Sequence, residues 1–342
     1  MKKQYYLLDI VKFICCFFVV ALHTGFLSEF DSVTGFWIEK SLLRLAVPFY
    51  FISSGFLLGK KLNGATDINE VKAILVGYSK RLVIMLVVFE PISILLNGWV
   101  ELSQGKSFVY IVLSAARYVI FYPKGALWFV QACLVAVWIW YFFRKYNLNR
   151  FILPVAGFLY GFALLCNSYY FLVENTIIGS GVNLLIRITA SPRNGVFVGF
   201  LMIYLGMCVS KYEKQNRLSK AGLGAAVGIS YVLYLVEVYL LSGRATMDDG
   251  SLYILLPVFS MLLCLFCAQF TSEKTNTKQL RNLSTGIYLL HLPLSYIRYL
   301  GIYWFSYDMR GIVGFLLVTT VSVVICLLSY RSKNKTMANL LK

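Results

Sequence analysis

The chain has 342 residues, of which 59% are hydrophobic and only 14% charged, and its mean hydropathy of +0.72 excludes an ordinary water-soluble protein. The net charge of +17 does not indicate nucleic-acid binding, because the basic residues are spread between apolar runs and form no single patch. The composition therefore predicts an all-α polytopic membrane protein.

Ten apolar runs have about the length that a helix needs to cross a bilayer, roughly 20 residues. They are residues 7–28, 41–59, 80–98, 126–143, 150–167, 195–211, 221–242, 252–270, 284–305 and 311–330. We expect one transmembrane domain over residues 1–342, with a short tail at 331–342 and no cleavable signal peptide. The eight cysteines lie almost entirely inside these runs, so we expect buried thiols, no disulfides and no metal site.

The loops between these runs alternate in charge. With the N-terminus inside, most loop lysines and arginines fall on the cytoplasmic side, among them Lys60, Lys61 and Arg81. Both termini are therefore predicted to be cytoplasmic. The two long outer connections, residues 99–125 and 168–194, are predicted to lie on the outer surface or to dip back into the membrane as a lid.

The first run carries three ionisable residues, Asp9, Lys12 and His23. Lys12 and His23 are eleven residues apart, which places them on one helix face and about 16 Å apart along the axis. Asp9 and Lys12 suit either a cavity or the headgroup level, whereas His23 lies deeper in the run. Such a stripe is expected to face a protein interior or a wet cavity.

The second and third runs each combine a polar residue with a proline. Arg44 is expected to begin the second run, Pro48 to kink it, and the small residues at 53–55 to allow close approach of a helix or a ligand. In the third run Glu90 precedes Pro91, a helix breaker. Glu90 is either a functional carboxylate or a buried, protonated one.

Three later segments hold further candidates. Trp128 opens the fourth run and suits an interfacial anchor as well as a site. Arg193-Asn194 enters the sixth run, where a broken helix start could hold an anion or simply be capped. In the ninth run Tyr288, His291 and Arg298 are spaced to place the last two on one face, with Pro293 expected to break the helix between them.

Both histidines of the chain thus lie inside predicted spans, each on a face shared with a cation. A neutral histidine can act as a general base, and neighbouring cations can hold a phosphate or a developing oxyanion. This combination suits acyl transfer from a phosphate-bearing carrier to a hydroxyl group, and it equally suits proton-coupled transport.

The residues taken together resemble the acyltransferase 3 family of integral membrane acyltransferases over essentially the whole chain. The resemblance rests on Lys12 and His23 in the first run, on Arg44, Pro48, Phe49, Ser54, Gly55 and Phe56 in the second, on Leu-Trp-Phe at 127–129, and on Tyr288 with His291. Lys12 stands where arginine is more usual, which keeps the charge but loses the bidentate fork.

The resemblance implies transfer of an acyl group, commonly acetyl from cytoplasmic acetyl-CoA, to a hydroxyl group of an extracytoplasmic or lipid-linked glycan at the bacterial plasma membrane. It makes His23 the essential histidine and Lys12 and Arg44 the paired basic residues near the carrier or the acyl group. In our interpretation His23 either deprotonates the acceptor hydroxyl or carries the acyl group itself. Our interpretation adds Glu90 as a group that orients or protonates His23, and phosphate docking at Lys60, Lys61 and Arg81. The remaining expected binding residues are Ser54, Trp128, Arg193, Tyr288, His291 and Arg298.

Two further expectations follow. Some family members carry a fused extracellular domain that completes transfer, so this chain either acylates directly or passes the group to a separate extracytoplasmic partner. The Arg193-Asn194-Gly195-x-Phe segment is similar to the membrane half of vancomycin-resistance serine racemases, so export of a small polar solute such as serine is the alternative.

Overall fold

The computed structural model describes residues 4–123, 125–213, 215, 218–273, 275–305 and 310–331, and for residues 298–305 it describes the backbone alone. Within these residues the chain is helical, and the β-type pairing is limited to an isolated bridge between Gln4 and Ser272. The predicted all-α class is therefore confirmed.

The contacts of the chain form two compact units. The first comprises residues 1–46, 84–127 and 272–342 and contains α1 (Tyr6–Thr24), η1 (Phe26–Glu29), α2 (Ser32–Ser41), η2 (Leu43–Leu45), α5 (Phe108–Ile120), η3 (Gly125–Leu127), α12 (Lys278–Phe305) and α13 (Gly311–Arg331). The second comprises residues 47–83 and 128–271 and contains most of α3 (Ala46–Leu62), with α6 (Trp128–Lys145), η4 (Asn149–Phe151), α7 (Ile152–Leu165), η5 (Tyr170–Leu172), α8 (Ile177–Thr189), the π-turn η6 (Gly195–Gly199), α9 (Phe200–Tyr212), α10 (Lys220–Leu241) and α11 (Leu255–Ala268). The long helix α4 (Ile68–Ser103) contributes its first part to the second unit and the rest to the first.

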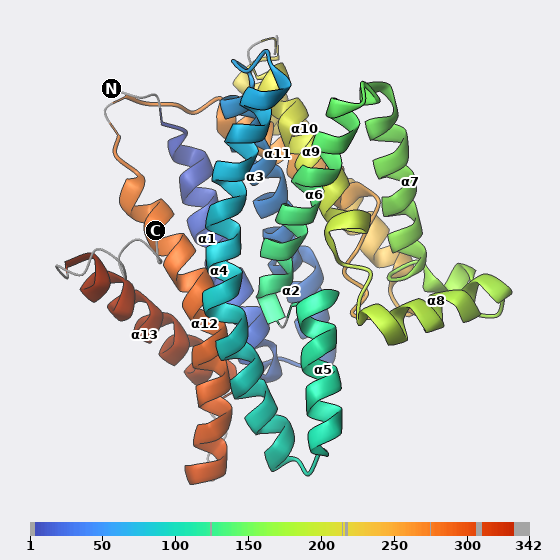
Figure 1. The fold of residues 1–342 in the computed structure, drawn as a ribbon, viewed down its shortest axis with the longest axis vertical. Coiled ribbons are helices and arrows are strands. Elements are labelled where there is room, and N and C mark those ends of the chain that lie inside the picture. The colour runs from blue at the N-terminus through green and yellow to red at the C-terminus, as the bar shows by residue number, and fades with distance from the viewer. Residues whose placement is uncertain are drawn as a thin grey trace. The chain divides into compact units, whose positions relative to one another are not determined.

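In the first unit α1, α12 and α13 pack against one another (Figure 1). Polar contacts join α1 and α12 near their N-terminal ends. The buried Asp9 carboxylate accepts a hydrogen bond from the Thr277 hydroxyl and lies 3.6 Å from the Arg281 guanidinium. Further along, the Ser284 hydroxyl donates to the Lys12 carbonyl at 3.3 Å. Asp9 thus joins α1 to α12, which satisfies a charge that is costly to bury alone.

In the second unit α3 and α9 touch backbone to backbone. A Cβ atom added at Gly55 would lie 2.2 Å from the Ile203 carbonyl oxygen, and one added at Gly206 would lie 2.1 Å from the Ile52 carbonyl oxygen. Small residues four apart are the usual means by which membrane helices approach this closely. The close approach expected at Gly55 is confirmed, and the element that uses it is helix α9.

Seven helical stretches of the described residues are long and apolar enough to cross a membrane: Tyr6–Thr24, Ser32–Leu62, Ile68–Ser103, Phe108–Lys145, Gly195–Tyr212, Lys220–Leu241 and Gly311–Arg331. A helix also occupies each of the ten predicted runs, although α7 and α11 are short. The count of ten spans and the side of each terminus stay predictions.

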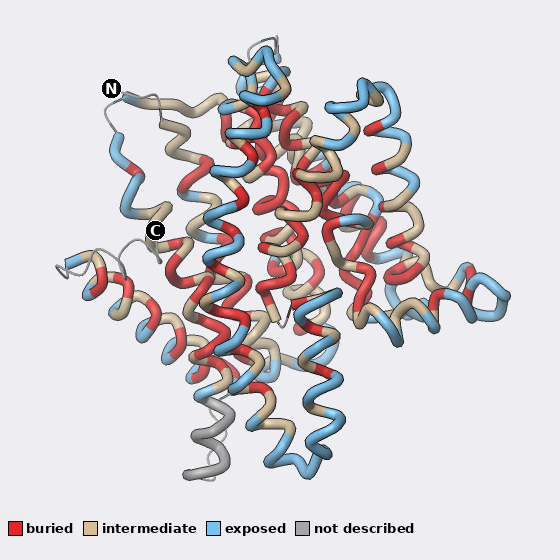
Figure 2. The backbone as a smooth tube through the Cα atoms, viewed as in Figure 1, coloured by how far each residue is buried: buried red, intermediate tan, exposed pale blue. Residues whose placement is uncertain are grey.

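Large apolar side chains are exposed along the outer faces of many helices, as in Leu95 (73% exposed) and Phe108 (75%), which is typical of lipid-facing surfaces (Figure 2).

Three prolines act differently from the sequence prediction. Pro91 and Pro293 lie inside α4 and α12, which continue through them, so neither residue breaks its helix. Pro48 lies in the first turn of α3, where a proline needs no kink. A serine hydroxyl donates a hydrogen bond to a backbone carbonyl oxygen beside each of the two inner prolines. Ser93 donates to Phe89 at 2.9 Å, and Ser295 donates to His291 at 2.7 Å. These bonds satisfy carbonyl oxygens in the helical turns that contain the prolines.

The two long outer connections each contain a helix. Residues 99–125 hold α5, which begins at its cap Ser107, and residues 168–194 hold α8, which begins at its cap Thr176. The described cysteines are free, and all are buried except the half-buried Cys208, in agreement with the prediction.

Candidate functional site

His23 occupies the last turn of α1. The helix ends at Thr24 because Gly25 adopts the left-handed conformation (φ +72°) that closes many helix C-termini. The histidine therefore lies at one end of the first helix and not deep within it, which corrects the sequence prediction. A histidine is also well placed at a helix C-terminus, where the helix dipole favours positive charge.

The structure brings the two histidines of the chain together. The ring centroids of His23 and His291 are 5.3 Å apart, and the ring planes make an angle of 44°. His291 lies in α12, fully buried, and its Nδ1 is 2.6 Å from the Tyr288 carbonyl oxygen. Because a carbonyl only accepts hydrogen bonds, Nδ1 carries the hydrogen. In the neutral ring Nε2 then keeps its lone pair, and this atom is buried without a hydrogen bond within the described structure.

Tyr288 links this helix to the loop before α6. Its hydroxyl donates to the Ala126 carbonyl in η3, and its ring centroid lies 5.8 Å from that of His291. The neighbouring Gly125 has φ +62°, and a Cβ there would lie 2.5 Å from a methyl carbon of Leu292. Tyr288 thus fixes the η3 loop against α12, and the substrate contact expected from the sequence stays a prediction.

A cavity of about 450 Å³ lies beside His23 in the first unit. Its polar lining comes from α1, from α4 and the residue that follows it, and from α12, and consists of His23, Asn97, Glu101, Gln104, Ser295 and Tyr296. One carboxylate oxygen of Glu101, Oε2, is buried and makes no hydrogen bond to any described residue. Asn97 lies seven residues after Glu90, and Glu101 lies four residues after Asn97, so all three lie along one face of α4.

The lining defines what the cavity can bind. Among the residues that the structure describes, the lining contains two amides, a carboxylate, two hydroxyls and an imidazole, and no lysine or arginine. Such groups accept and donate hydrogen bonds to hydroxyls, and the carboxylate disfavours a negatively charged ligand. The arrangement suits a neutral polyhydroxyl compound next to a histidine that can take up a proton.

The other predicted residues of the first unit have the following surroundings. Lys12 is half-buried in α1, one helical turn from Asp9. Arg44 lies in η2, which packs against α1, and not at the start of a span; its Nε donates to Glu39 at 2.8 Å. Glu90 is buried within α4. The side chain of Arg298 lies outside the described residues.

The predicted residues Ser54, Trp128 and Arg193 lie in the second unit. Ser54 is half-buried in α3. Trp128 is buried, packs on Phe51 at 5.6 Å, and has the Arg193 guanidinium 5.6 Å from its ring centroid. Trp128 is therefore packed in the core of the second unit. The position of the Arg193 guanidinium over its ring is that of a cation–π pair.

Arg193 is bound by two aspartates. Its Nε lies 3.1 Å from Asp248, and its Nη1 lies 2.6 Å from Asp249. The Ser191 hydroxyl also donates to Asp248 at 2.6 Å. Burial raises the pKa of Asp248, and the charge of Arg193 opposes that rise. Asn194 caps η6 by accepting from two backbone N–H groups, which corresponds to the ordinary helix cap.

Sequence reasoning missed three features of these surroundings. Glu101 stands in a loop-like part of the sequence, and only its spacing from Glu90 on one helix face could have indicated it. The partners of the arginines, Glu39 for Arg44 and Asp248 with Asp249 for Arg193, were also missed. Glu39 is five residues from its partner, whereas the two aspartates are more than 50 residues distant and carry no local signal.

The comparisons with known proteins agree with this architecture. The family model described as an acyltransferase domain matches residues 5–331. The chain is similar to an amino-acid racemase of Enterococcus faecalis (26% identity over 63% of the chain and 30% of that protein) and to a serine/alanine racemase of Enterococcus gallinarum (26% identity over 83% and 40%). A second amino-acid racemase of Enterococcus faecalis is 23% identical over 98% of the chain and 47% of that protein.

The chain thus spans less than half of the length of each of these curated relatives. No solved structure matches it. Because the family model covers almost all of the sequence and the structure is an apolar helical one, the protein belongs to the acyltransferase 3 family of integral membrane acyltransferases.

Proposed function

We propose that the protein moves an acyl group, acetyl in the simplest case, from cytoplasmic acyl-CoA to a hydroxyl group of an extracytoplasmic or lipid-linked cell-surface sugar. The observation that carries the proposal is the position of His23. Its side chain lines a polar cavity, and the ring of His291 lies 5.3 Å from its own.

In the proposed reaction His23 acts as a general base. It accepts the proton of the acceptor hydroxyl while the hydroxyl oxygen attacks the carbonyl carbon of the thioester. The carbon–sulfur bond then breaks, the acyl group stays on the acceptor as an ester, and the thiolate of coenzyme A takes up the proton from the imidazolium. Atoms and charge balance without any further reactant.

His291 acts in this scheme as a positioning residue. The hydrogen bond from its Nδ1 to the Tyr288 carbonyl fixes the orientation and tautomer of the ring. The fixed ring then restricts the orientations open to His23. A base held in one orientation reacts faster, since displacements of about 1 Å can cost a hundredfold in rate.

The cavity supports a sugar as acceptor. Asn97, Glu101 and Gln104 present amide and carboxylate groups of the kind that hydrogen-bond hydroxyls. Lys12, Arg44 and Glu90 remain proposed contributors near the carrier. The proposed location is the bacterial plasma membrane, and a separate extracytoplasmic transferase is a proposed partner where the acyl group travels further.

Export of a small polar solute such as serine is a second candidate, and the similarity to a serine/alanine racemase favours it. A free amino acid carries a carboxylate as well as an ammonium group. Among its described lining residues, the cavity offers Glu101 for the ammonium group and no lysine or arginine for the carboxylate. This imbalance makes the sugar acceptor the better match.

The experiment is transfer from radiolabelled acetyl-CoA by the purified protein in liposomes, with His23→Ala beside the wild type. Loss of a general base predicts a fall of at least about a hundredfold. Ser28→Ala, at an exposed residue just beyond the same helix, is the control and should keep full activity. Both variants should melt like the wild type.

Two results would contradict the proposal. Full transfer by His23→Ala would exclude the histidine mechanism. Accumulation of labelled serine that does not depend on acetyl-CoA, together with no acetyl transfer, would instead establish the exporter.

A further inference from the structure

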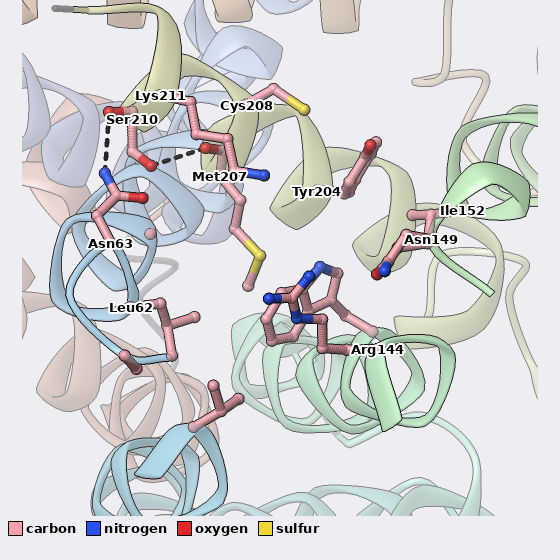
Figure 3. Close-up of a pocket in the computed structure, with 14 residues that line it drawn as sticks. Leu62, Asn63, Arg144, Asn149, Ile152, Tyr204, Met207, Cys208, Ser210 and Lys211 are labelled. Atoms are coloured by element: carbon pink, nitrogen blue, oxygen red, sulfur yellow. Dashed lines mark hydrogen bonds between the residues drawn. The ribbon is translucent and has the colours of Figure 1, made fainter. Parts of the chain in front are cut away.

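A second pocket lies in the second unit, where α3, α6 and α9 end and α7 begins. It has a volume of about 200 Å³ (Figure 3). Its main polar and aromatic lining residues are Asn63, Trp140, Arg144, Asn149, Tyr204 and Lys211. The loop charges predict that this end of the helices faces the cytoplasm.

The pocket is positively charged. Arg144 and Lys211 both line it, and none of its lining residues is an aspartate or a glutamate. Neither cation forms an ion pair with a carboxylate in the part of the chain that the structure describes. Nearby Lys60 differs, because the Glu213 carboxylate binds its ammonium group. The charge of the pocket is therefore available to an anion, whereas that of Lys60 is already matched.

Helix dipoles alone do not explain this arrangement. Arg144 and Lys211 each lie in the last turn of a helix, where a cation is favoured in any protein. That preference would be met equally by side chains that point into water. Here the two charges come from different helices and line the same hollow, and Figure 3 shows Arg144 reaching into it opposite Leu62 and Met207.

The walls of the pocket indicate the rest of the ligand. The side chains of Leu62, Val71, Ile152 and Met207 provide apolar surface, and Trp140 and Tyr204 add aromatic rings. At the base, a Cβ on Gly59 would lie 2.3 Å from the Ser210 hydroxyl, so the helices close the pocket tightly there. Apolar and aromatic walls beside paired cations suit an organic phosphate better than a bare inorganic ion.

We propose that this pocket binds the phosphate group of an organic phosphate, with Arg144 forming bidentate hydrogen bonds to the phosphate oxygens and Lys211 acting as a point charge. Two sources carry this chemistry: a soluble phosphorylated carrier such as coenzyme A, and the headgroup of an anionic phospholipid. The identification of the carrier with the acyl donor rests on the proposed function, whereas the phosphate site itself does not. The pocket would then take the docking role that the sequence assigned to Lys60, Lys61 and Arg81.

The test measures binding of labelled coenzyme A, without an acyl group, to the full-length protein in nanodiscs of neutral phosphatidylcholine. Arg144→Gln and Lys211→Gln should each weaken binding at least about tenfold, and higher salt should weaken wild-type binding further. Lys145→Gln is the matched control, because Lys145 follows Arg144 on the same helix but lies over the Tyr146 ring and does not line the pocket. Melting curves show that each variant is folded.

Each outcome is decisive. Arg144-dependent binding of coenzyme A supports the soluble carrier. Absence of such binding, together with phosphatidylglycerol that co-purifies with the wild type but not with Arg144→Gln, supports the lipid headgroup. Wild-type behaviour of both variants towards both ligands, or an equal loss in Lys145→Gln, would overturn the proposal.

The assay also separates this site from the transfer reaction. His23→Ala should bind coenzyme A like the wild type, because His23 lies in the other unit. If the wild type transfers no acetyl group but binds coenzyme A through Arg144, the proposed function fails and the phosphate site stands.

Discussion

Two polar clusters of the molecule differ in how completely their hydrogen bonds are satisfied. In the histidine pair, His23 and His291, the buried Nε2 of His291 makes no hydrogen bond within the described structure. In the arginine cluster, Arg193 with Ser191, Asp248 and Asp249, the guanidinium and the first aspartate have several partners each. Buried polar groups are normally satisfied, so an exception in a polar region indicates a functional role and a complete set indicates a structural one.

The largest expected effect comes from removing the cation of the arginine cluster. Arg193→Ala leaves two carboxylates without their counter-charge and should lower the free energy of unfolding by about 3 kcal/mol, while transfer per folded molecule is unchanged. Thermal unfolding in detergent measures the first quantity, and the liposome assay the second. Normal stability with lost transfer would show instead that Arg193 binds substrate, and the comparison between the clusters would fail.

The same variant should respond to pH in a defined direction. Burial raises the pKa of Asp248, and the charge of Arg193 is the largest influence that opposes this rise. Without Arg193 the protonated carboxyl is favoured still more. The loss of stability should therefore be greatest near neutral pH and shrink as the pH falls through the raised pKa of Asp248.

A smaller effect is expected at the histidine pair. His291→Ala should reduce kcat roughly tenfold to a hundredfold by loosening His23, and should also change the pH at which kcat/KM falls on the acid side. Protein stability should change less than in Arg193→Ala. An unchanged pH profile with a lower melting temperature would reduce His291 to a packing residue.

The smallest effect is expected at the cavity wall. Glu101→Gln keeps the shape of the side chain but removes its charge, so we expect a rise in the acceptor KM of about tenfold with little change in kcat. Steady-state kinetics with varied acceptor measure both. An unchanged KM would show that the acceptor binds elsewhere, and the unsatisfied carboxylate would then need another explanation.

Much of the architecture could be predicted from the sequence because it depends on local patterns. Helices occupy all ten apolar runs, and the approach of a helix at Gly55 follows from small residues in an apolar stretch. The predicted breaks at Pro91 and Pro293 were wrong. A proline removes one helical hydrogen bond. The rest of the backbone stays helical because its N–H and C=O groups have no water to bond in the membrane and are satisfied only within the helix.

The site was less predictable because it depends on contacts distant in sequence. The early end of α1 was indicated locally by Gly25, but the meeting of His23 with His291 needs the packing of α1 against α12. The arrangement of Asp248 and Asp249 around Arg193 likewise needs a loop more than 50 residues away. A single sequence lists the residues of such pairs but does not show which of them come into contact.

The crossing of α3 and α9 has a consequence for mutational surveys of this protein. Any side chain at Gly55 or Gly206 would overlap the backbone of the facing helix. A screen scored by activity alone would therefore rank both glycines with His23, although neither contacts the cavity. The Ser-Gly-Phe signature at 54–56 would then be mistaken for catalytic machinery, although its glycine is required because α3 and α9 pack too closely for a side chain there.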